Sequence, residues 1–213
     1  VFLAVESLYS MDGDFAPLTE FKALADGQDA TLIIDEAHAT GVFGEAGKGL
    51  AAGLDGAENV ITLRTLGKAL GCEGALLFLP KVARDFLINR ARGFIFSTAP
   101  SPFSARLALA ALRLNAEADD LRAELHARIA TARSALAKLG YTPSPSQIQP
   151  LVLGDEARTM RAAAQLQAEG FDIRGVRPPT VPAGTSRLRL SLTLNTERAD
   201  LDRLFQVLPQ VLA

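Results

Sequence analysis

Three short apolar runs, separated by polar and helix-like sequence, most constrain how this chain can fold. They are residues 1–5 (VFLAV), 31–34 (TLII) and 59–63 (NVITL). Continuous apolar runs of this length, rich in β-branched residues, are typical of strands buried on both faces of a parallel sheet. Because residues 17–25 have the spacing of an amphipathic helix, the first two runs are predicted to be joined by a right-handed crossover. The pattern therefore predicts a mostly parallel sheet.

A fourth apolar run, residues 75–79 (ALLFL), follows the third after a short linker. A linker of that length has no room for a crossover helix, so this pair is predicted to be antiparallel. Residues 82–92 then have helical spacing. From residue 103 to 139 the sequence is rich in alanine and leucine and predicts a long helix with a bend near Asn115.

The long helix predicts a boundary between two domains. We assign residues 1–115 to an α/β domain and residues 116–213 to the connecting helix and a smaller α+β domain. The smaller domain is expected from strand-like runs and helical segments at residues 148–153, 157–169, 171–173, 187–192 and 198–212. The predicted fold class is therefore α/β in the first part and α+β in the second.

Composition narrows the class of partner. The 213 residues are 48% hydrophobic, enough for a real core, and the net charge is only -2 with scattered lysines and arginines. Such a chain lacks the basic surface that binds nucleic acid or anionic membranes, so small molecules are the expected partners. A single cysteine, Cys72, excludes an internal disulfide and is typical of a reducing compartment, so we expect a cytoplasmic location.

Two further features concern the ends and the membrane. Apolar runs such as residues 74–79 are far shorter than the roughly 20 residues needed to cross a bilayer, so no spanning segment is expected. The chain opens within a strand-like run and without an initiator methionine. We therefore expect it to be the later part of a longer protein.

Lys68 is the first candidate for chemistry. It lies between Gly67 and Gly71, directly after the third apolar run. Apolar neighbours and a constrained backbone predict partial desolvation, which favours the neutral amine that acts as a nucleophile and forms Schiff bases. A surface lysine in a glycine-containing turn is the alternative, and for an isolated lysine it is the commoner case.

Asp35 is the second candidate, because it follows the second run at the edge where open α/β sheets bind ligands. A carboxylate there needs a cation, and the pyridinium nitrogen of pyridoxal phosphate (PLP) is one. His38 could hydrogen-bond the phenolic oxygen of that ring. The alternatives are a helix N-cap for Asp35 and a structural role for His38. With two histidines and one cysteine in the chain, a zinc site is not expected.

The order of these residues leads to a resemblance. A carboxylate at the end of one strand and a lysine at the end of the next, 33 residues later, is the order found in fold-type-I PLP enzymes. The sequence resembles the α-oxoamine synthase family at residues 10–18 (SMDGDFAPL), 34–41 (IDEAHATG), 65–71 (TLGKALG) and 96–98 (FST). Residues 148–155 and 177–189 are most similar to members that condense L-alanine with a pimeloyl thioester in biotin biosynthesis. The resemblance extends from residue 6 to about residue 193.

The resemblance implies roles for the residues near the cofactor. Lys68 would hold PLP covalently and then remove the Cα proton of the substrate. Asp35 would pair with the ring nitrogen, and His38 with the phenolic oxygen. Ser10 would lie beside the cofactor, and Thr65 would contact its phosphate, as a hydroxyl before a glycine turn can do.

The resemblance also implies a shared site and a substrate site. Ser97 and Thr98 would reach the phosphate of a neighbouring subunit in a homodimer, unless they form a plain Ser-Thr turn. Thr180 and Arg189 would meet the substrate, with Arg189 binding the α-carboxylate through its planar fork. Arg187 lies on the same strand face by alternation and is not excluded. An exposed, solubilising arginine is the alternative for both, and the commoner one for Arg187.

Some features depart from the family pattern or lie outside the chain. Ser101 stands where the family often has proline, and Leu66 where it often has phenylalanine. The family stacks an imidazole on the cofactor ring, yet the only other histidine, His126, is expected on the solvated face of the long helix. We therefore expect the stacking group upstream of residue 1, and weak cofactor binding by this chain alone.

The implied activity is that of a PLP-dependent acyltransferase. It would join L-alanine to a pimeloyl thioester, carried by coenzyme A or acyl carrier protein, and release the carrier and carbon dioxide. Three alternatives remain open. They are a sister synthase of the glycine C-acetyltransferase or 5-aminolevulinate synthase type, a non-catalytic subunit or fragment, and a metal-dependent hydrolase that uses Asp35 and His38.

Overall fold

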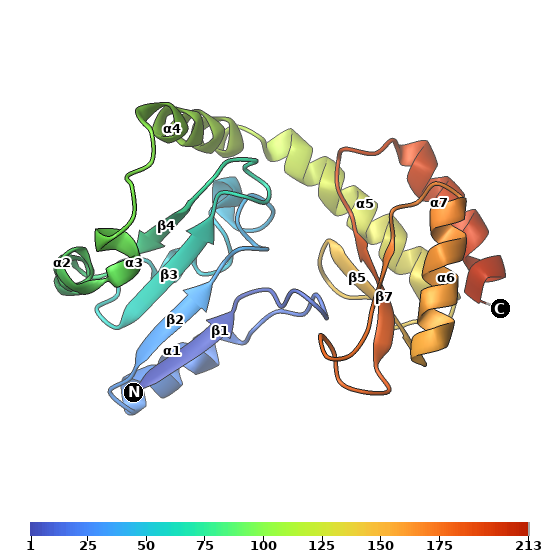
Figure 1. The fold of residues 1–213 in the computed structure, drawn as a ribbon, viewed down its shortest axis with the longest axis horizontal. Coiled ribbons are helices and arrows are strands. Elements are labelled where there is room, and N and C mark those ends of the chain that lie inside the picture. Colours follow the sequence, from blue (N-terminus) through green and yellow to red (C-terminus); the bar gives the residue numbers. More distant parts are fainter. Residues whose placement is uncertain (213) are drawn as a thin grey trace. The chain divides into compact units, whose positions relative to one another are not determined.

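The computed structural model describes residues 1–212 and consists of two compact units (Figure 1). The first unit comprises residues 1–8 and 15–122, and the second comprises residues 9–14 and the described residues from 123 onward. A short N-terminal segment thus belongs to the second unit, although its flanks on both sides belong to the first. The domain boundary between residues 115 and 116 stays a prediction.

The first unit is built on a four-stranded sheet in the order β1-β2-β3-β4. Its strands are β1 (Phe2–Glu6), β2 (Thr31–Asp35), β3 (Val60–Thr65) and β4 (Ala75–Phe78). The first three are parallel and β4 is antiparallel to β3, so both predictions about strand direction are confirmed. Helix α1 (Leu18–Gly27) connects β1 to β2 and closes a small core. That core is formed by Ala25, Ala30, Leu32, Ile34, Ala51 and Val60.

Strand β1 is less buried than its sequence predicts. It is the edge strand of this sheet and pairs only with β2, and Phe2 is 71% exposed. The prediction of burial on both faces is therefore wrong for this run, because apolar composition alone does not tell an edge strand from a central one.

Helices α2 (Lys81–Arg90), α3 (Arg92–Ile95) and α4 (Pro102–Ala116) complete the first unit. Ser101 caps α4, because its Oγ accepts the backbone N–H of Ser104 at 3.2 Å. After residues 117–118 the chain continues as α5 (Asp119–Lys138), so the bend predicted near Asn115 is confirmed as a break between two helices.

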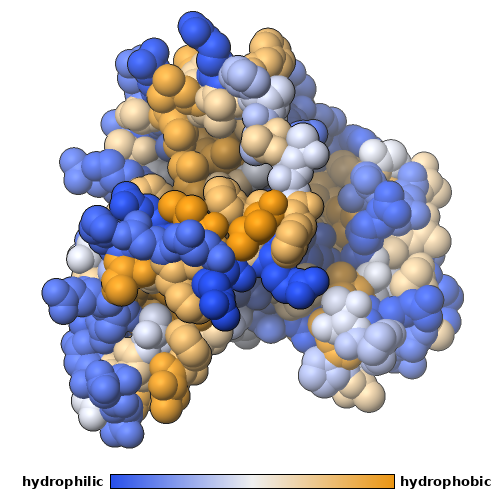
Figure 2. All heavy atoms as spheres, turned by 60° about the vertical axis from the view of Figure 1, so that its left-hand side comes forward, coloured by the Kyte–Doolittle hydropathy of each residue, from blue (hydrophilic) through white to orange (hydrophobic). Residues whose placement is uncertain are grey.

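The helices α2 to α4 leave a large apolar surface exposed. Figure 2 turns forward the left-hand side of Figure 1, which carries these helices, and shows hydrophobic side chains gathered there. The most exposed large hydrophobic side chains of α2, α3, α4 and the residues that join them are Val82, Phe86, Phe94, Phe96, Phe103 and Leu114. We refer to these six side chains as the α2–α4 apolar surface.

The second unit is a three-stranded antiparallel sheet packed against helices. Its order is β5-β7-β6, with β5 (Ile148–Gly154), β6 (Arg174–Val176) and β7 (Ser186–Ser191). Helices α6 (Glu156–Ala168) and α7 (Arg198–Leu212) pack with α5 around its core. The core includes Leu136, Leu151, Leu166, Leu188, Leu190 and Leu208.

The strand expected at residues 171–173 lies three residues later, in β6. Pairing with β7 begins at Arg174, whereas Ile173 is buried in the core and the ring of Phe171 lies under the guanidinium of Arg203, 4.1 Å away. These side chains therefore pack as a loop rather than as a strand. No helix within residues 1–212 has both the length and the apolar content to span a membrane.

Candidate functional site

Asp35 and Thr65 end two neighbouring parallel strands of the first unit. The register pairs Asp35 with Leu63, and the N–H of Glu36 donates to the carbonyl of Leu63 at 2.8 Å. Thr65 therefore ends β3 two residues beyond the partner of Asp35, immediately before the loop that carries Lys68. Because parallel strands share one carboxyl edge, the fold brings these three residues to the same edge of the sheet.

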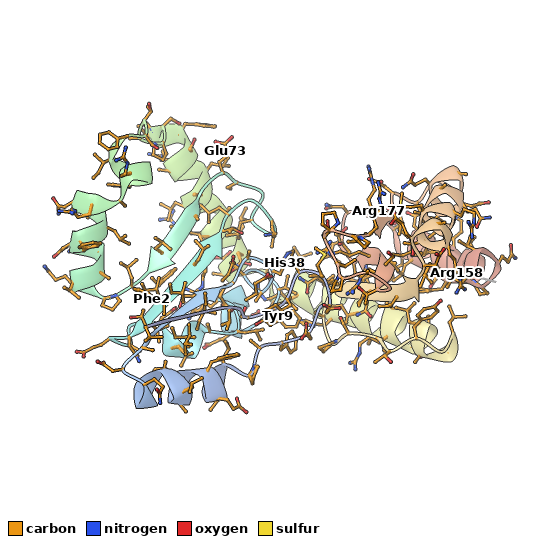
Figure 3. The ribbon with its side chains drawn as sticks, turned by 60° about the horizontal axis from the view of Figure 1, so that its bottom comes forward. Phe2, Tyr9, His38, Glu73, Arg158 and Arg177 are labelled. Carbon is orange, nitrogen blue, oxygen red and sulfur yellow. The ribbon has the colours of Figure 1, made fainter. Side chains whose placement is uncertain are left out.

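A tight turn follows Asp35 and carries His38 (Figure 3). Oδ1 of Asp35 accepts the N–H of Ala37 at 2.7 Å, and the carbonyl of Glu36 accepts the N–H of Thr40 at 2.9 Å. No helix starts here, so the helix N-cap alternative for Asp35 is wrong: its side chain closes a turn of the Asx type. This bond fixes the direction of the carboxylate at the sheet edge.

Thr65 supplies the observation that best fits a ligand at this edge. Its Oγ1 is buried and has no hydrogen-bond partner among residues 1–212. A buried hydroxyl without a partner is costly, and a group from outside the chain, such as water or a ligand, would remove that cost. A phosphate oxygen of a cofactor at this edge would satisfy it.

Lys68 lies in a loop that is held in shape by its backbone. The N–H of Leu66 donates to Gly74 at 2.9 Å, and the N–H of Cys72 donates to Leu66 at 2.8 Å. The side chain of Lys68 is exposed. The expectation of a desolvated lysine is therefore wrong for this structure, because the loop holds Lys68 at the surface of the first unit.

Glu36, which the sequence analysis did not single out, is fully buried beside Asp35. Its Oε1 accepts the N–H groups of Leu50 and Ala51, each at 3.1 Å, and its Oε2 lies 4.0 Å from Nε of Arg64. Desolvation is the largest influence on this carboxyl and raises the pKa of Glu36. Glu36 thereby ties residues 50–51 to the end of β2. No sequence signal marked this role, because Glu36 follows another carboxylate and its partners lie 14 and 15 residues further along the chain.

Arg189 and Ser10 meet in the second unit. Nε of Arg189 donates to the carbonyl of Ser10 at 2.6 Å, and Nη1 donates to Oγ of Ser191 at 2.8 Å. The guanidinium is half-buried, and desolvation lowers the pKa of Arg189 below its usual value. A partly dehydrated guanidinium binds a carboxylate more strongly than one in bulk water.

Arg187 differs from the commoner case expected for it. Instead of being an exposed arginine, it is 5% exposed and its Nη1 donates to the carboxylate of Asp12. Its Nε donates to the carbonyl of Thr185 at 3.0 Å. The prediction of a solubilising role is wrong, because the segment of residues 9–14 lies on this face of β7 and covers the side chain.

The remaining predicted residues lie at exposed positions. Ser97 and Thr98 are exposed between α3 and α4, where Oγ of Ser97 donates to the carbonyl of Gly93 at 2.5 Å. Thr180 is exposed in a turn closed by its N–H and the carbonyl of Arg177 at 3.0 Å. His126 is exposed on α5. Within residues 1–212, no three or more His, Cys, Asp or Glu side chains are grouped so that they could hold a metal ion.

Sequence comparison extends over nearly the whole chain. The family model described as aminotransferase class I and II matches residues 1–208. The 8-amino-7-oxononanoate synthase of Anaeromyxobacter dehalogenans (strain 2CP-C) is 44% identical over 213 residues, covering 99% of this chain and 54% of that protein. The synthase of the same name from Ralstonia pickettii (strain 12J) is 44% identical over 216 residues, covering 97% and 52%. The chain thus spans about half the length of the curated relatives it matches.

Solved structures give the same result. A serine palmitoyltransferase from S. paucimobilis, with a bound PLP–myriocin aldimine, is 25% identical and superposes with a TM-score of 0.90 over 99% of this chain and 54% of that chain. The 8-amino-7-oxononanoate synthase from Francisella tularensis is 26% identical, with a TM-score of 0.83 over 98% and 62%. The predicted fold-type-I α/β class is therefore confirmed.

Proposed function

The chain belongs to the aminotransferase class I and II family, and from this premise we propose that it forms the later half of a PLP-dependent 8-amino-7-oxononanoate synthase. One observation carries the proposal: Asp35, the unsatisfied Thr65 hydroxyl and the Lys68 loop lie at one carboxyl edge of two parallel strands. The identity to relatives of that name supports the same function. The reaction would join L-alanine to a pimeloyl thioester in biotin biosynthesis.

The residues at this edge fit PLP in their chemistry. When bound, PLP supplies an electron sink for the negative charge that develops at the substrate Cα. The amine of Lys68 would bind the cofactor and later hold the proton taken from Cα. The Asp35 carboxylate, held in direction by the Ala37 N–H, would keep the ring nitrogen protonated, and Thr65 would donate to the phosphate.

Other residues would bind substrate and a second subunit. We propose that His38 meets the phenolic oxygen of the ring and that Thr180 and Arg189 bind the amino acid, with Arg189 on its carboxylate. Ser97 and Thr98, both exposed, would reach the phosphate in a partner subunit of a homodimer.

The location and a rival function complete the proposal. We propose a cytoplasmic location, because Cys72, the single cysteine, is a buried free thiol. A sister synthase with another amino acid and thioester is the second candidate, favoured by the TM-score of 0.90 to a serine palmitoyltransferase.

The full-length protein that carries this chain tests the proposal. We expect product from L-alanine with a pimeloyl thioester, and less from glycine or L-serine or from acetyl, succinyl or palmitoyl thioesters. Lys68→Ala should abolish the absorbance band of the covalent bond between lysine and cofactor, and lower turnover by roughly 10²–10⁴-fold, the usual contribution of a positioned base. Lys81→Ala, an exposed lysine on α2, is the matched control.

Two results would contradict the assignment. Full activity of Lys68→Ala would exclude the proposed role of this amine. Preference for another amino acid and thioester would favour the sister synthase.

A further inference from the structure

We propose that the turn of residues 10–13, the Ser10–Gly13 turn, positions Arg189, and that Asp12 and Arg187 act on the substrate through it. This inference rests on the proposed function, in which Arg189 binds the carboxylate of the amino acid. It also separates the roles of the two arginines of β7: one binds substrate, and the other holds the turn. All of these residues belong to the second unit.

Arg187 is committed to the protein rather than to a ligand. A buried guanidinium must be paired, and that of Arg187 donates to the carboxylate of Asp12 and to the carbonyl of Thr185. Asp12 itself is largely exposed, so the ion pair joins the covered face of β7 to the outer side of the turn. Arg187 therefore anchors the turn through its middle residue.

Gly13 lets the turn lie directly against the start of strand β5. Its φ is +71°, and a Cβ at this position would lie 2.3 Å from the carbonyl oxygen of Ile148. Hydrogen bonds hold this part of the chain in place. Oγ of Ser144 donates to the same carbonyl oxygen of Ile148, and the side-chain amide of Gln149 donates to the carbonyl of Ser144 at 3.0 Å. Any larger residue would clash here, so this close contact between the turn and β5 requires glycine.

The opposite end of the turn reaches Arg189. The carbonyl of Ser10 accepts Nε, and the hydroxyl of Ser191 accepts from Nη1, so two bonds on different edges fix the plane of the guanidinium. A planar fork binds a carboxylate through two parallel bonds only when its direction is set in advance. If the turn loosened, Nε of Arg189 would lose the Ser10 carbonyl as its acceptor, and the guanidinium could rotate.

Substrate binding in the full-length protein tests this chain of contacts. Asp12→Asn should weaken the binding of L-alanine about tenfold, which is the loss expected for one charge-assisted hydrogen bond. The absorbance change of the cofactor measures this binding. Ethylamine, which lacks a carboxylate, should bind equally well to both proteins. Asp14→Asn, an exposed carboxylate just beyond the turn, is the matched control and should behave like the parent. Equal weakening of both ligands, or of neither, would overturn the inference.

A conservative pair of variants examines the second anchor. Ser191→Ala should also weaken the binding of L-alanine and leave the binding of ethylamine unchanged. Ser191→Thr keeps the hydroxyl and should bind L-alanine as the parent does. If alanine and threonine at this position behave alike, the hydroxyl does not orient Arg189 and the inference fails.

Hydrogen exchange measures how firmly the turn is held, and it does not depend on any catalysed reaction. Amides of residues 9–14 should exchange faster in Asp12→Asn and in Arg187→Lys than in the parent, with no substrate present. If the protein proves inactive as a synthase but this acceleration is seen, the proposed function fails and the anchoring stands. Unchanged exchange in both variants would refute the anchoring itself.

Discussion

The two units of the chain differ in how completely they bury their own apolar side chains. The second unit closes a continuous core of leucines from α5, α6, α7 and the β5–β7 sheet. The first unit has a smaller core around β2 and β3 and leaves the α2–α4 apolar surface exposed. Exposed patches of this kind mark surfaces that other groups cover. The unit that carries Asp35, Thr65 and Lys68 thus depends more on groups outside itself to cover its apolar side chains.

The largest expected effect tests whether the two units differ in how much buried apolar side chains stabilise them. Leu188 of β7 is fully buried, so Leu188→Ala should lower the free energy of unfolding by about 2–5 kcal/mol. Phe103→Ala removes a larger side chain, but one that is 76% exposed, and should change it by no more than about 0.5 kcal/mol. Urea unfolding followed by circular dichroism compares the two. Equal losses of unfolding free energy in the two variants would contradict the difference in burial between the units.

A smaller effect is expected at Gly49, a tightly packed point of the first unit. A Cβ on Gly49, whose φ is +96°, would lie 1.6 Å from Oε2 of the buried Glu36. Gly49→Ala should therefore destabilise the first unit by about 1–3 kcal/mol and speed amide exchange in residues 35–40. Gly53→Ala is the control, because nothing lies within 4 Å of its Cβ. A neutral Gly49→Ala would mean that Glu36 does not hold this segment.

The smallest effect concerns pH, to which the two units should respond with opposite sign. The folded pKa of Glu36 is raised by burial, so its contribution to stability is complete below about 4.5 and is lost as the pH rises through the raised value. Hydrogen bonds from Arg198 and Arg128 lower the pKa of Glu124 to about 2, so its contribution is complete above about 4.5 and is lost as the pH falls towards 2.

Hydrogen exchange at several pH values would measure each unit separately. Glu36→Gln should remove the loss above pH 4.5 in the first unit, and Glu124→Gln should remove the acid loss in the second. Added salt should weaken the Glu124 effect, because its ion pair with Arg198 is exposed. A parallel response of both units would contradict the opposite signs.

Local patterns in the sequence predicted most of the elements. The apolar runs located β2 and β3, and the short linker before Ala75 gave the direction of β4, because chain length limits how strands connect. Asp35 and Lys68 were located by the same reasoning, since each follows a strand. What could not be predicted is burial, which depends on contacts between distant residues.

Three residues illustrate that limit. Lys68 has apolar neighbours in sequence yet is exposed, whereas Arg187 alternates with leucines like a surface residue yet is buried. Arg187 owes its burial to Asp12, 175 residues away, which no periodic pattern can reveal. Glu36 looked like part of a motif, but its partners lie 14 and 15 residues further along the chain.

The Ser10–Gly13 turn has a consequence for how such a gene can be recombined. A crossover at the 122/123 boundary would keep every strand of the second unit together but would inherit residues 9–14 from the other parent. The hybrid would then combine an arginine at 187 with whatever residue the foreign parent encodes at position 12. Positions 12 and 187 should consequently change together among viable chimaeras, although the gene holds them far apart.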